Sequence, residues 1–208
     1  MIVGVLFTFT LTSAQTGDEN KSISYKLDEE LVRKVMEPST SEVDKANRQV
    51  MVDFIERFCT SYVVKDLGFI QNVFGEGLLS FVKGNLVSIE SRKKGQESSD
   101  KRINYQFQSK KQYVSILQRV FNKNVSVEVL LSDIVVEVRP NKPNVYGLRL
   151  KHGWSSGPYM DEGYIFLLWD FTNPDAPQIH VRTWQPTEFV VGKPLDEDEI
   201  FTIDDFDV

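Results

Sequence analysis

The sequence has a single cysteine, Cys59, and only two histidines, His152 and His180, in 208 residues. A disulfide within the chain is therefore excluded. Neither histidine lies in an HExxH or CxxC-type arrangement, and there is no glycine-rich phosphate loop, so the sequence predicts neither a metal site nor a cofactor. Cys59 follows Phe58 in a helical pattern that includes Tyr62, which favours a small buried residue over a nucleophile.

Basic residues are absent from the start of the chain. No lysine or arginine precedes the apolar run within residues 1–14, which ends in the small residues Thr12 and Ala14 ahead of Gln15. The run is too short to cross a bilayer, and its small-residue end is typical of a secretory signal peptide. We therefore expect a periplasmic or secreted protein with no membrane span. A polar extension at 15–41 follows the signal peptide.

The carboxy-terminal end also lacks any base. Residues 194–208 hold seven acids, and because the net charge of the whole chain is −6, the part before this tail is close to neutral. A near-neutral body argues against nucleic-acid binding. The charge predicts a solvated acidic tail at 191–208. Phe201, Ile203 and Phe206 leave open a tail that docks on its own body or on a partner chain.

Three segments have the apolar spacing of helices. The first follows candidate caps at 39–41 and repeats apolar residues at three- and four-residue steps up to Tyr62. The second covers 65–77 and ends at two glycines. The third opens with a capping box, in which the side chains of Ser109 and Gln112 satisfy each other's backbone donors.

Strand-like runs make up most of the remaining sequence. A strand at 78–91 and a polar loop at 92–101 precede the third helix. Four further strands are predicted at 125–138, 146–154, 163–171 and 178–185. Their short connections predict an antiparallel meander. The predicted fold class is α+β, with one domain that packs a curved antiparallel sheet on about three helices.

The hairpin at 161–186 concentrates polar and aromatic side chains. His180, Arg182 and Trp184 alternate along its second strand, which predicts that they share one face of the sheet. The register decides whether Asp170 lies on that face. If it does, Asp170 orients His180 as a base and Arg182 holds an anion. The competing interpretation is structural, with Arg182 stacked on Trp184 or paired with Asp170.

The order of elements resembles the nuclear transport factor 2-like superfamily, which includes ketosteroid isomerase, scytalone dehydratase and the SnoaL-like proteins. The resemblance covers about residues 42–190 and is carried by a long first helix, the KDLGFIQNVF turn and strand, a further helix and a meander ending in a tryptophan-bearing strand. The motifs YGLRLKHGW, DEGYIFLLWDF and IHVRTWQP resemble a secreted branch from gut Bacteroidetes. The resemblance implies a cystatin-like roll with a conical cavity, which serves enzymes, binding modules and dimerisation modules alike.

The sequence departs from the catalytic members of that superfamily. Ketosteroid isomerases use a carboxylate base on the first strand, whereas the predicted first strand has no acid before Glu90. We therefore expect a non-catalytic module that binds a small ligand or a protein in or beside the cavity. The alternatives are a lyase, isomerase or hydrolase that uses His180, Arg182 and Asp170, and a structural homodimer formed through the sheet face.

The candidate ligand-binding residues combine aromatic and polar side chains from the first helix and the strands. They are Tyr62, Trp154, Tyr164, His180, Arg182 and Trp184. His152, beside Trp154, is expected to have a smaller part in any chemistry.

Overall fold

The computed structural model describes residues 25–37, 39–89, 100–123, 127–156, 159–190 and 193–206. For residues 77–89, 100–106, 159, 189–190 and 193 it describes the backbone alone. The predicted signal peptide and residues 92–99 of the predicted polar loop lie outside these ranges, so the structure tests neither.

The described helices form one layer of the fold. Their bounds are Glu29–Met36 (α1), Glu42–Val64 (α2), Leu67–Val73 (α3) and Lys110–Lys123 (α4). Ser41 caps α2 by accepting a hydrogen bond from Asp44 N. Before α4, Ser109 Oγ accepts from Gln112 N and Ser109 N donates to Gln112 Oε1. These contacts satisfy backbone donors that the first turn of a helix leaves open, and they confirm the predicted capping box.

Within the described residues, six strands form one open sheet. Their bounds are Phe74–Ile89 (β1), Asp100–Ser109 (β2), Glu128–Arg139 (β3), Lys142–Ser156 (β4), Tyr159–Asp170 (β5) and Gln178–Pro186 (β6). The strand order is β2-β1-β6-β5-β4-β3, and all neighbours are antiparallel except β1 and β6. The short strands Glu188–Val190 (β7) and Lys193–Pro194 (β8) pair with each other.

The α+β fold class predicted from the sequence is confirmed, and so is the antiparallel meander of the four consecutive predicted strands, which are β3 to β6. Strand β2 was not predicted, although Ile103, Tyr105 and Phe107 alternate as they do in a strand. The sheet is also not wholly antiparallel, because β6 lies beside β1 and runs parallel to it. Local alternation shows where strands lie but not which distant strands pair.

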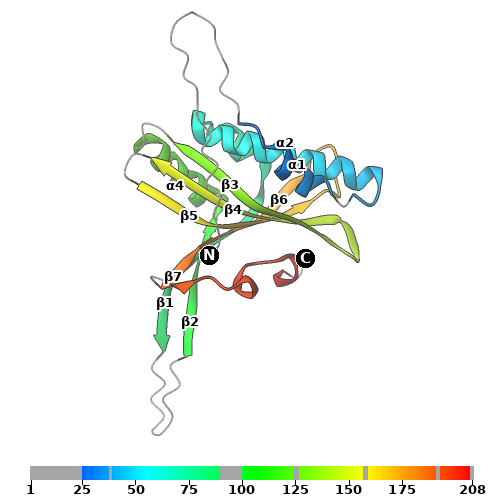
Figure 1. The fold of residues 1–208 in the computed structure, drawn as a ribbon. Coiled ribbons are helices and arrows are strands. Elements are labelled where there is room, and N and C mark those ends of the chain that lie inside the picture. The colour runs from blue at the N-terminus through cyan, green and yellow to red at the C-terminus, as the bar shows by residue number, and fades with distance from the viewer. Residues whose placement is uncertain are drawn as a thin grey trace, which may run out of the picture.

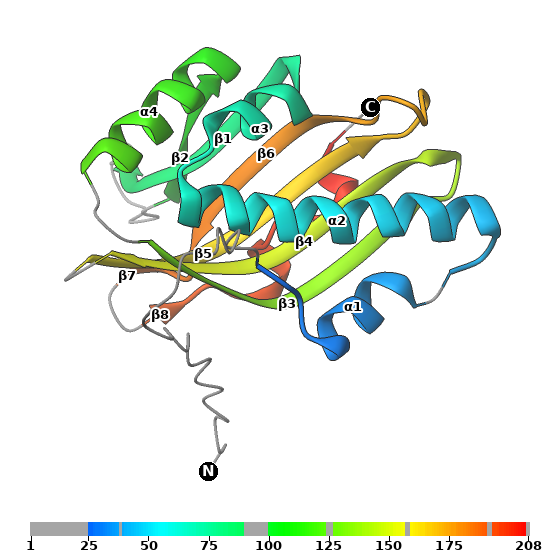
Figure 2. The same cartoon turned by 90° about the horizontal axis from the view of Figure 1, so that it is seen from above.

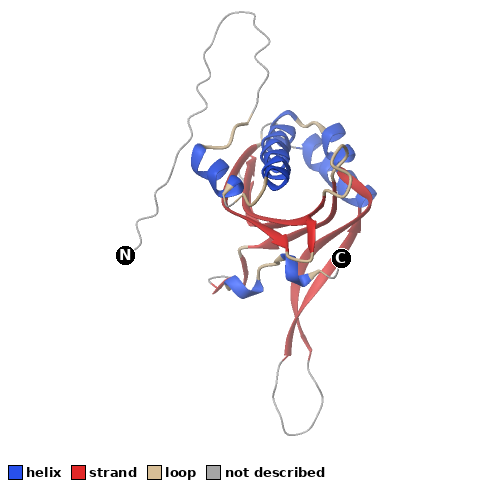
Figure 3. Ribbon diagram, turned by 90° about the vertical axis from the view of Figure 1, so that its right-hand side faces the viewer, coloured by secondary structure: helices blue, strands red, loops and turns tan. Residues whose placement is uncertain are grey.

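The sheet curves around the helices, which lie on its concave face (Figures 1 and 3). Figure 2 shows α2 lying across the sheet. The core between the layers is built from large apolar side chains, among them Phe54, Ile55, Leu148 and Trp169. Leu31 and Val35 of α1 join the same core, so the packed unit begins before residue 42, where the sequence analysis placed its boundary.

A buried polar network ties α1 to α2 and to the sheet. Asp44 Oδ1 accepts hydrogen bonds from Arg48 Nε at 2.9 Å and from Tyr146 Oη at 3.1 Å. Arg48 also donates to Val35 O at the end of α1, at 2.7 Å. Burial works to raise the pKa of Asp44, but hydrogen bonds from Thr40 and Arg48 bring that pKa below its ordinary value. The charges of Asp44 and Arg48 are thus buried as a satisfied pair.

The carboxy-terminal segment covers part of the convex face of the sheet (Figure 3). Gln185 of β6 holds it with both atoms of its amide. Nε2 donates to Glu199 O at 2.7 Å, and Oε1 accepts from Phe201 N at 2.8 Å. Because Gln185 is fully buried, these two bonds satisfy an amide that would otherwise lack partners.

The same segment is held a second time on β3. Arg139 donates to the carbonyl oxygens of Ile203 and Phe206, and Glu137 accepts from Ile203 N at 3.0 Å. Ile203 is buried, and the Phe206 ring stacks on Phe166 of β5 with centroids 5.2 Å apart. The tail therefore docks on its own body through Ile203 and Phe206, as the sequence left open, while the acidic residues 196–199, 204 and 205 stay exposed as a solvated tail predicts. It also covers part of the face on which a homodimer contact is predicted.

Candidate functional site

Five side chains gather on the concave face: Tyr62, Tyr113, His152, Arg182 and Trp184, which we call the concave cluster. The hydroxyls of Tyr62 on α2 and Tyr113 on α4 lie 3.3 Å apart. The guanidinium carbon of Arg182 lies 4.5 Å from the centroid of the Tyr113 ring. The His152 ring packs between Tyr62 and Trp184, with centroids 5.6 and 6.0 Å away. Two helices and two strands thus contribute to one group of polar and aromatic side chains.

Three nitrogen atoms of this cluster lack hydrogen-bond partners among the described residues. Both ring nitrogens of His152 and Nε of Arg182 are buried without a hydrogen-bond partner among the described residues. His152 is 2% exposed and Arg182 is 7% exposed. Buried polar groups are nearly always hydrogen-bonded, because an unmade bond costs about 1–3 kcal/mol. Three such atoms in one place make the concave cluster the best candidate for a binding site.

Charge in the concave cluster is confined to Arg182. Burial, together with the nearby charge of Arg182, lowers the pKa of His152 to about 3, so its imidazole is neutral at pH 7. Burial also raises the pKa of Tyr62 well above its ordinary value, with a further contribution from Tyr113. Neither His152 nor Tyr62 is therefore ionised at neutral pH, and neither offsets the guanidinium charge.

A glycine makes room for Trp184 in the cluster. A β-carbon on Gly163 would lie 2.4 Å from Gln185 O and 2.8 Å from the Trp184 ring, closer than any side chain allows. Gly163 is also the Cα partner of His152 across β4 and β5. The bare backbone at Gly163 is thus what lets the indole of Trp184 pack against His152.

A β-bulge in β6 separates residues that the sequence analysis places on one face. The pairing of β5 with β6 shifts between Leu168 and Trp169, so that His180 has no opposite residue on β5. One extra residue reverses the alternation of side chains beyond it. Arg182 and Trp184 consequently face the helices, whereas His180 lies on the convex face.

On the convex face, His180 pairs with Asp170, and His180 Nε2 lies 3.5 Å from Asp170 Oδ2. Both side chains are more than a third exposed. Burial works to raise the pKa of Asp170, but hydrogen bonds from Thr172 and the charge of His180 bring it below its ordinary value. The prediction that His180, Arg182 and Trp184 share a face is wrong, and the bulge keeps Arg182 away from the His180–Asp170 pair.

The predicted ligand-binding residues divide between the two faces. Tyr62, Trp154, Arg182 and Trp184 lie on the concave side, whereas Tyr164 and His180 lie on the convex side. Trp154 is two residues beyond His152 on β4, and its side chain hydrogen-bonds to Asp161. Burial raises the pKa of Asp161 above its ordinary value despite this bond. Tyr164 is the Cα partner of Gln185, which holds the tail.

Tyr113 was not among the site residues predicted from the sequence, and His152 was not predicted to lie beside Trp184. Tyr113 stands in the apolar stripe of α4, where its hydroxyl is the one polar feature. His152 and Trp154 alternate on β4 as Arg182 and Trp184 do on β6. His152 and Arg182 each precede a tryptophan by two positions. This common pattern was the signal in the sequence that could have placed both residues on the same face of the sheet.

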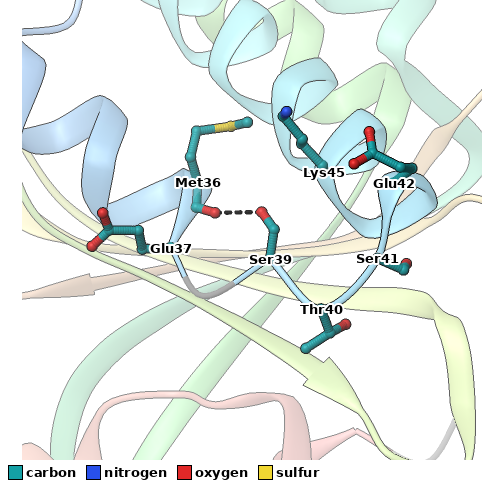
Figure 4. A pocket seen from close by; sticks show the side chains of 7 residues that line it. All are labelled: Met36, Glu37, Ser39, Thr40, Ser41, Glu42 and Lys45. Atoms are coloured by element: carbon teal, nitrogen blue, oxygen red, sulfur yellow. Dashed lines mark hydrogen bonds between the residues drawn. The ribbon is translucent and has the colours of Figure 1, made fainter.

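The surface hollow in Figure 4 lies away from this cluster, at the connection between α1 and α2. Its lining consists of Met36, Glu37, Ser39, Thr40, Ser41, Glu42 and Lys45. All of these except Met36 are exposed, and Ser39 Oγ donates to Met36 O across the turn. The hollow contains none of the orphaned nitrogens, so it is a weaker candidate than the concave cluster.

Metal-ligating side chains do not gather in the described part of the chain. No group of three or more His, Cys, Asp or Glu residues there is placed to hold a metal ion. The two histidines lie on opposite faces of the sheet. Among the described helices, none is long and apolar enough to cross a membrane.

No protein-family model and no curated protein sequence matches the chain. Solved structures match its fold at low identity. Naphthalene 1,2-dioxygenase with indole bound in its active site aligns with a TM-score of 0.50 and 8% identity over 68% of this chain and 79% of that one. A protein named as the beta subunit of an aromatic-ring-hydroxylating dioxygenase from Novosphingobium aromaticivorans aligns with a TM-score of 0.50 and 12% identity, over 74% and 100%. Bd1075 from Bdellovibrio bacteriovorus aligns with a TM-score of 0.50 and 15% identity over 72% of this chain, which spans 44% of that protein.

The chain shares its fold, a curved sheet wrapped around helices on its concave side, with the dioxygenase beta subunit. The superfamily resemblance noted in the sequence is thus confirmed at the level of fold. The resemblance to a secreted Bacteroidetes branch stays a prediction. Identities this low carry no residue roles from the matched proteins to this chain.

Proposed function

We propose that this chain is a small-ligand-binding module and that the concave cluster is its binding site. The observation that carries the proposal is the group of three buried nitrogens, on His152 and Arg182, without partners among the described residues. A bound molecule with acceptor and donor atoms supplies those partners. The rings of Tyr62, Tyr113 and Trp184 add flat apolar surface, the usual lining of a small-molecule site.

Binding fits this cluster better than catalysis. A general base works best with a pKa near the operating pH, and the pKa of His152 lies near 3. None of the described carboxylates hydrogen-bonds to His152 to orient it. The enzyme alternative with His180, Arg182 and Asp170 lacks its geometry, because Arg182 lies on the other face of the sheet from the His180–Asp170 pair.

We propose further that the module works in the periplasm or outside the cell, because the apolar run within residues 1–14 has the form of a secretory signal. Expression of the full chain followed by mass spectrometry of the exported fraction tests this. A mature protein that begins at or near Gln15 supports export. Full-length protein confined to the cytoplasm contradicts it.

A thermal-shift screen of small organic molecules on the full chain tests the proposed site. The affinity of each compound that raises the Tm is then measured for two variants. Trp184→Ala removes a ring from the concave cluster, and Tyr164→Ala removes a ring of similar size from the convex face. We expect hits to lose at least tenfold in affinity on Trp184→Ala, since a buried aromatic contact contributes more than about 1.4 kcal/mol. Hits that survive Trp184→Ala and vanish on Tyr164→Ala place binding on the convex face and refute the proposal.

A further inference from the structure

We infer that the ligand of the concave cluster is a monocarboxylate, a small organic acid whose carboxylate is held by Arg182 and whose apolar body packs on the surrounding rings. The inference rests on the proposed function and specifies the class of ligand. Its basis is a buried positive charge for which the described part of the chain supplies no counter-charge.

Arg182 is isolated from acids. It is 7% exposed, and none of the described carboxylates forms an ion pair with it. Its contact on α4 is the Tyr113 ring, 4.5 Å from the guanidinium carbon. A ring face recovers only part of the free energy that a guanidinium loses when it is taken out of water. The ring alone therefore does not balance the guanidinium.

The neighbouring strands do not provide the missing anion either. Arg182 pairs with Ser80 of β1, and the one acid in the sequence of β1 is Glu76, whose exposed carboxylate pairs with Lys110. The other neighbour of β6 is β5, and each of its three acids has a different partner: Asp161 hydrogen-bonds with Trp154, Glu162 pairs with Lys151 and Asp170 pairs with His180. The counter-charge of Arg182 must come from outside these elements.

The chemistry of the cluster selects a single negative charge. Arg182 is the one cation of the cluster, because His152 is neutral at pH 7. A ligand with two negative charges would therefore bury one charge without an opposite charge beside it. A guanidinium presents two parallel N–H donors that fit a carboxylate. A neutral imidazole adds one N–H donor for the same group. Tyr62 and Trp184, whose rings flank His152, then face the rest of the molecule.

Matched ligand pairs test this inference. Phenylacetate and cyclohexanecarboxylate are compared with phenylacetamide and cyclohexanecarboxamide, which keep the shape and remove the charge, and with inorganic phosphate at equal ionic strength. Affinities are measured by calorimetry on the full chain. The Arg182 Nε–H resonance is followed by NMR at each addition. We expect each acid to bind about 10- to 100-fold more tightly than its amide, as one charged hydrogen-bonded contact provides. The Nε–H resonance should shift with the acids and not with phosphate.

Two variants separate a binding role from a structural one. Arg182→Met should abolish the preference for the acid and raise the Tm of the ligand-free protein, because it removes an uncompensated buried charge. Arg57→Met is the matched control, since Arg57 also lies 4.5 Å from the centroid of a ring, that of Phe69, but is exposed. This control should keep the preference.

The outcomes distinguish the inference from the function on which it rests. Equal affinity for acids and amides, both lost on Trp184→Ala, overturns the monocarboxylate and leaves the proposed binding site in place. Phosphate that binds as tightly as phenylacetate also overturns it. If no member of the panel binds and the Arg182 Nε–H resonance never moves, both the inference and the proposed site fail.

Discussion

His152 and His180 show how neighbouring structure gives one residue type two different properties. His152 is buried against Tyr62 and Trp184 on the concave side, and its pKa is lowered to about 3. His180 lies on the convex face, more than a third exposed, with Asp170 as its partner. The first histidine is an uncharged hydrogen-bonding group at every physiological pH.

The lowered pKa of His152 predicts a dependence of stability on pH. Below pH 6.5 the unfolded chain binds a proton at this imidazole, whereas the folded chain does not until the pH approaches 3, so protonation favours unfolding. The free energy of unfolding should fall by on the order of 2 kcal/mol more between pH 6 and pH 4 in the wild type than in His152→Gln. Urea denaturation at a series of pH values measures this difference.

His180→Gln is the control for this effect, because it removes the other histidine from the convex face. We expect its pH profile to stay much closer to that of the wild type. A profile of His152→Gln that superimposes on the wild type would show that the imidazole is accessible to protons in the folded state.

Among the elements, α1 and α2 depend on the buried pair of Asp44 and Arg48. Arg48 joins Asp44 at 2.9 Å and reaches Val35 O at the end of α1. Both side chains are less than a tenth exposed, so removal of either partner leaves an unbalanced charge in the interior. This pair links α2 to the end of α1.

Asp44→Ala should therefore lower the free energy of unfolding by about 3–5 kcal/mol. Asp53→Ala, on the exposed side of the same helix where Asp53 accepts a hydrogen bond from Gln49, should change it by less than about 1 kcal/mol. Chemical denaturation of both variants provides the comparison. The double variant Asp44→Ala/Arg48→Met should recover part of the stability lost in Asp44→Ala. Equal losses of stability in Asp44→Ala and Asp53→Ala would contradict a special role for the buried pair.

The elements also show which features were predictable from the sequence. The capping box of Ser109 and Gln112 and the spacing in α2 are local signals, and the structure confirms both. The bulge at His180 depends on how β6 fits β1 and β5, which lies outside any local pattern. Because the one extra residue of this bulge was not recognised in the sequence, Arg182 and His180 were predicted to lie on the same face of the sheet.

At the scale of the whole molecule, the fold has three layers rather than two. Helices lie on the concave face, the sheet is in the middle, and residues 196–206 lie on the convex face (Figure 1). The tail buries a second apolar cluster that includes Phe166, Leu168 and Val181 of the sheet. A homodimer through this face would have to displace the tail or pack around it.

Ile203→Asp tests this layer, because it places a charge at a buried position of the second apolar cluster. We expect a loss of about 2–4 kcal/mol in the free energy of unfolding and self-association through the uncovered face. Chemical denaturation and sedimentation velocity measure the two effects. Asp204→Ala, at the exposed next position, should leave both the association state and the stability as they are in the wild type. A monomeric Ile203→Asp with wild-type stability would mean that the tail does not protect this face.

The path of the tail also has a mechanical consequence. The tail is fastened to β6 by Gln185 and to β3 by Arg139 and Glu137, and it passes over β5 and β4 between those points. The convex surface of a curved sheet lengthens as the curvature increases, so a segment fastened across that surface limits how strongly the sheet can bend. Because the concave cluster lies on the inside of the same bend, release of the tail would let the sheet curve further and bring the residues around Arg182 closer together without a contact to any of them.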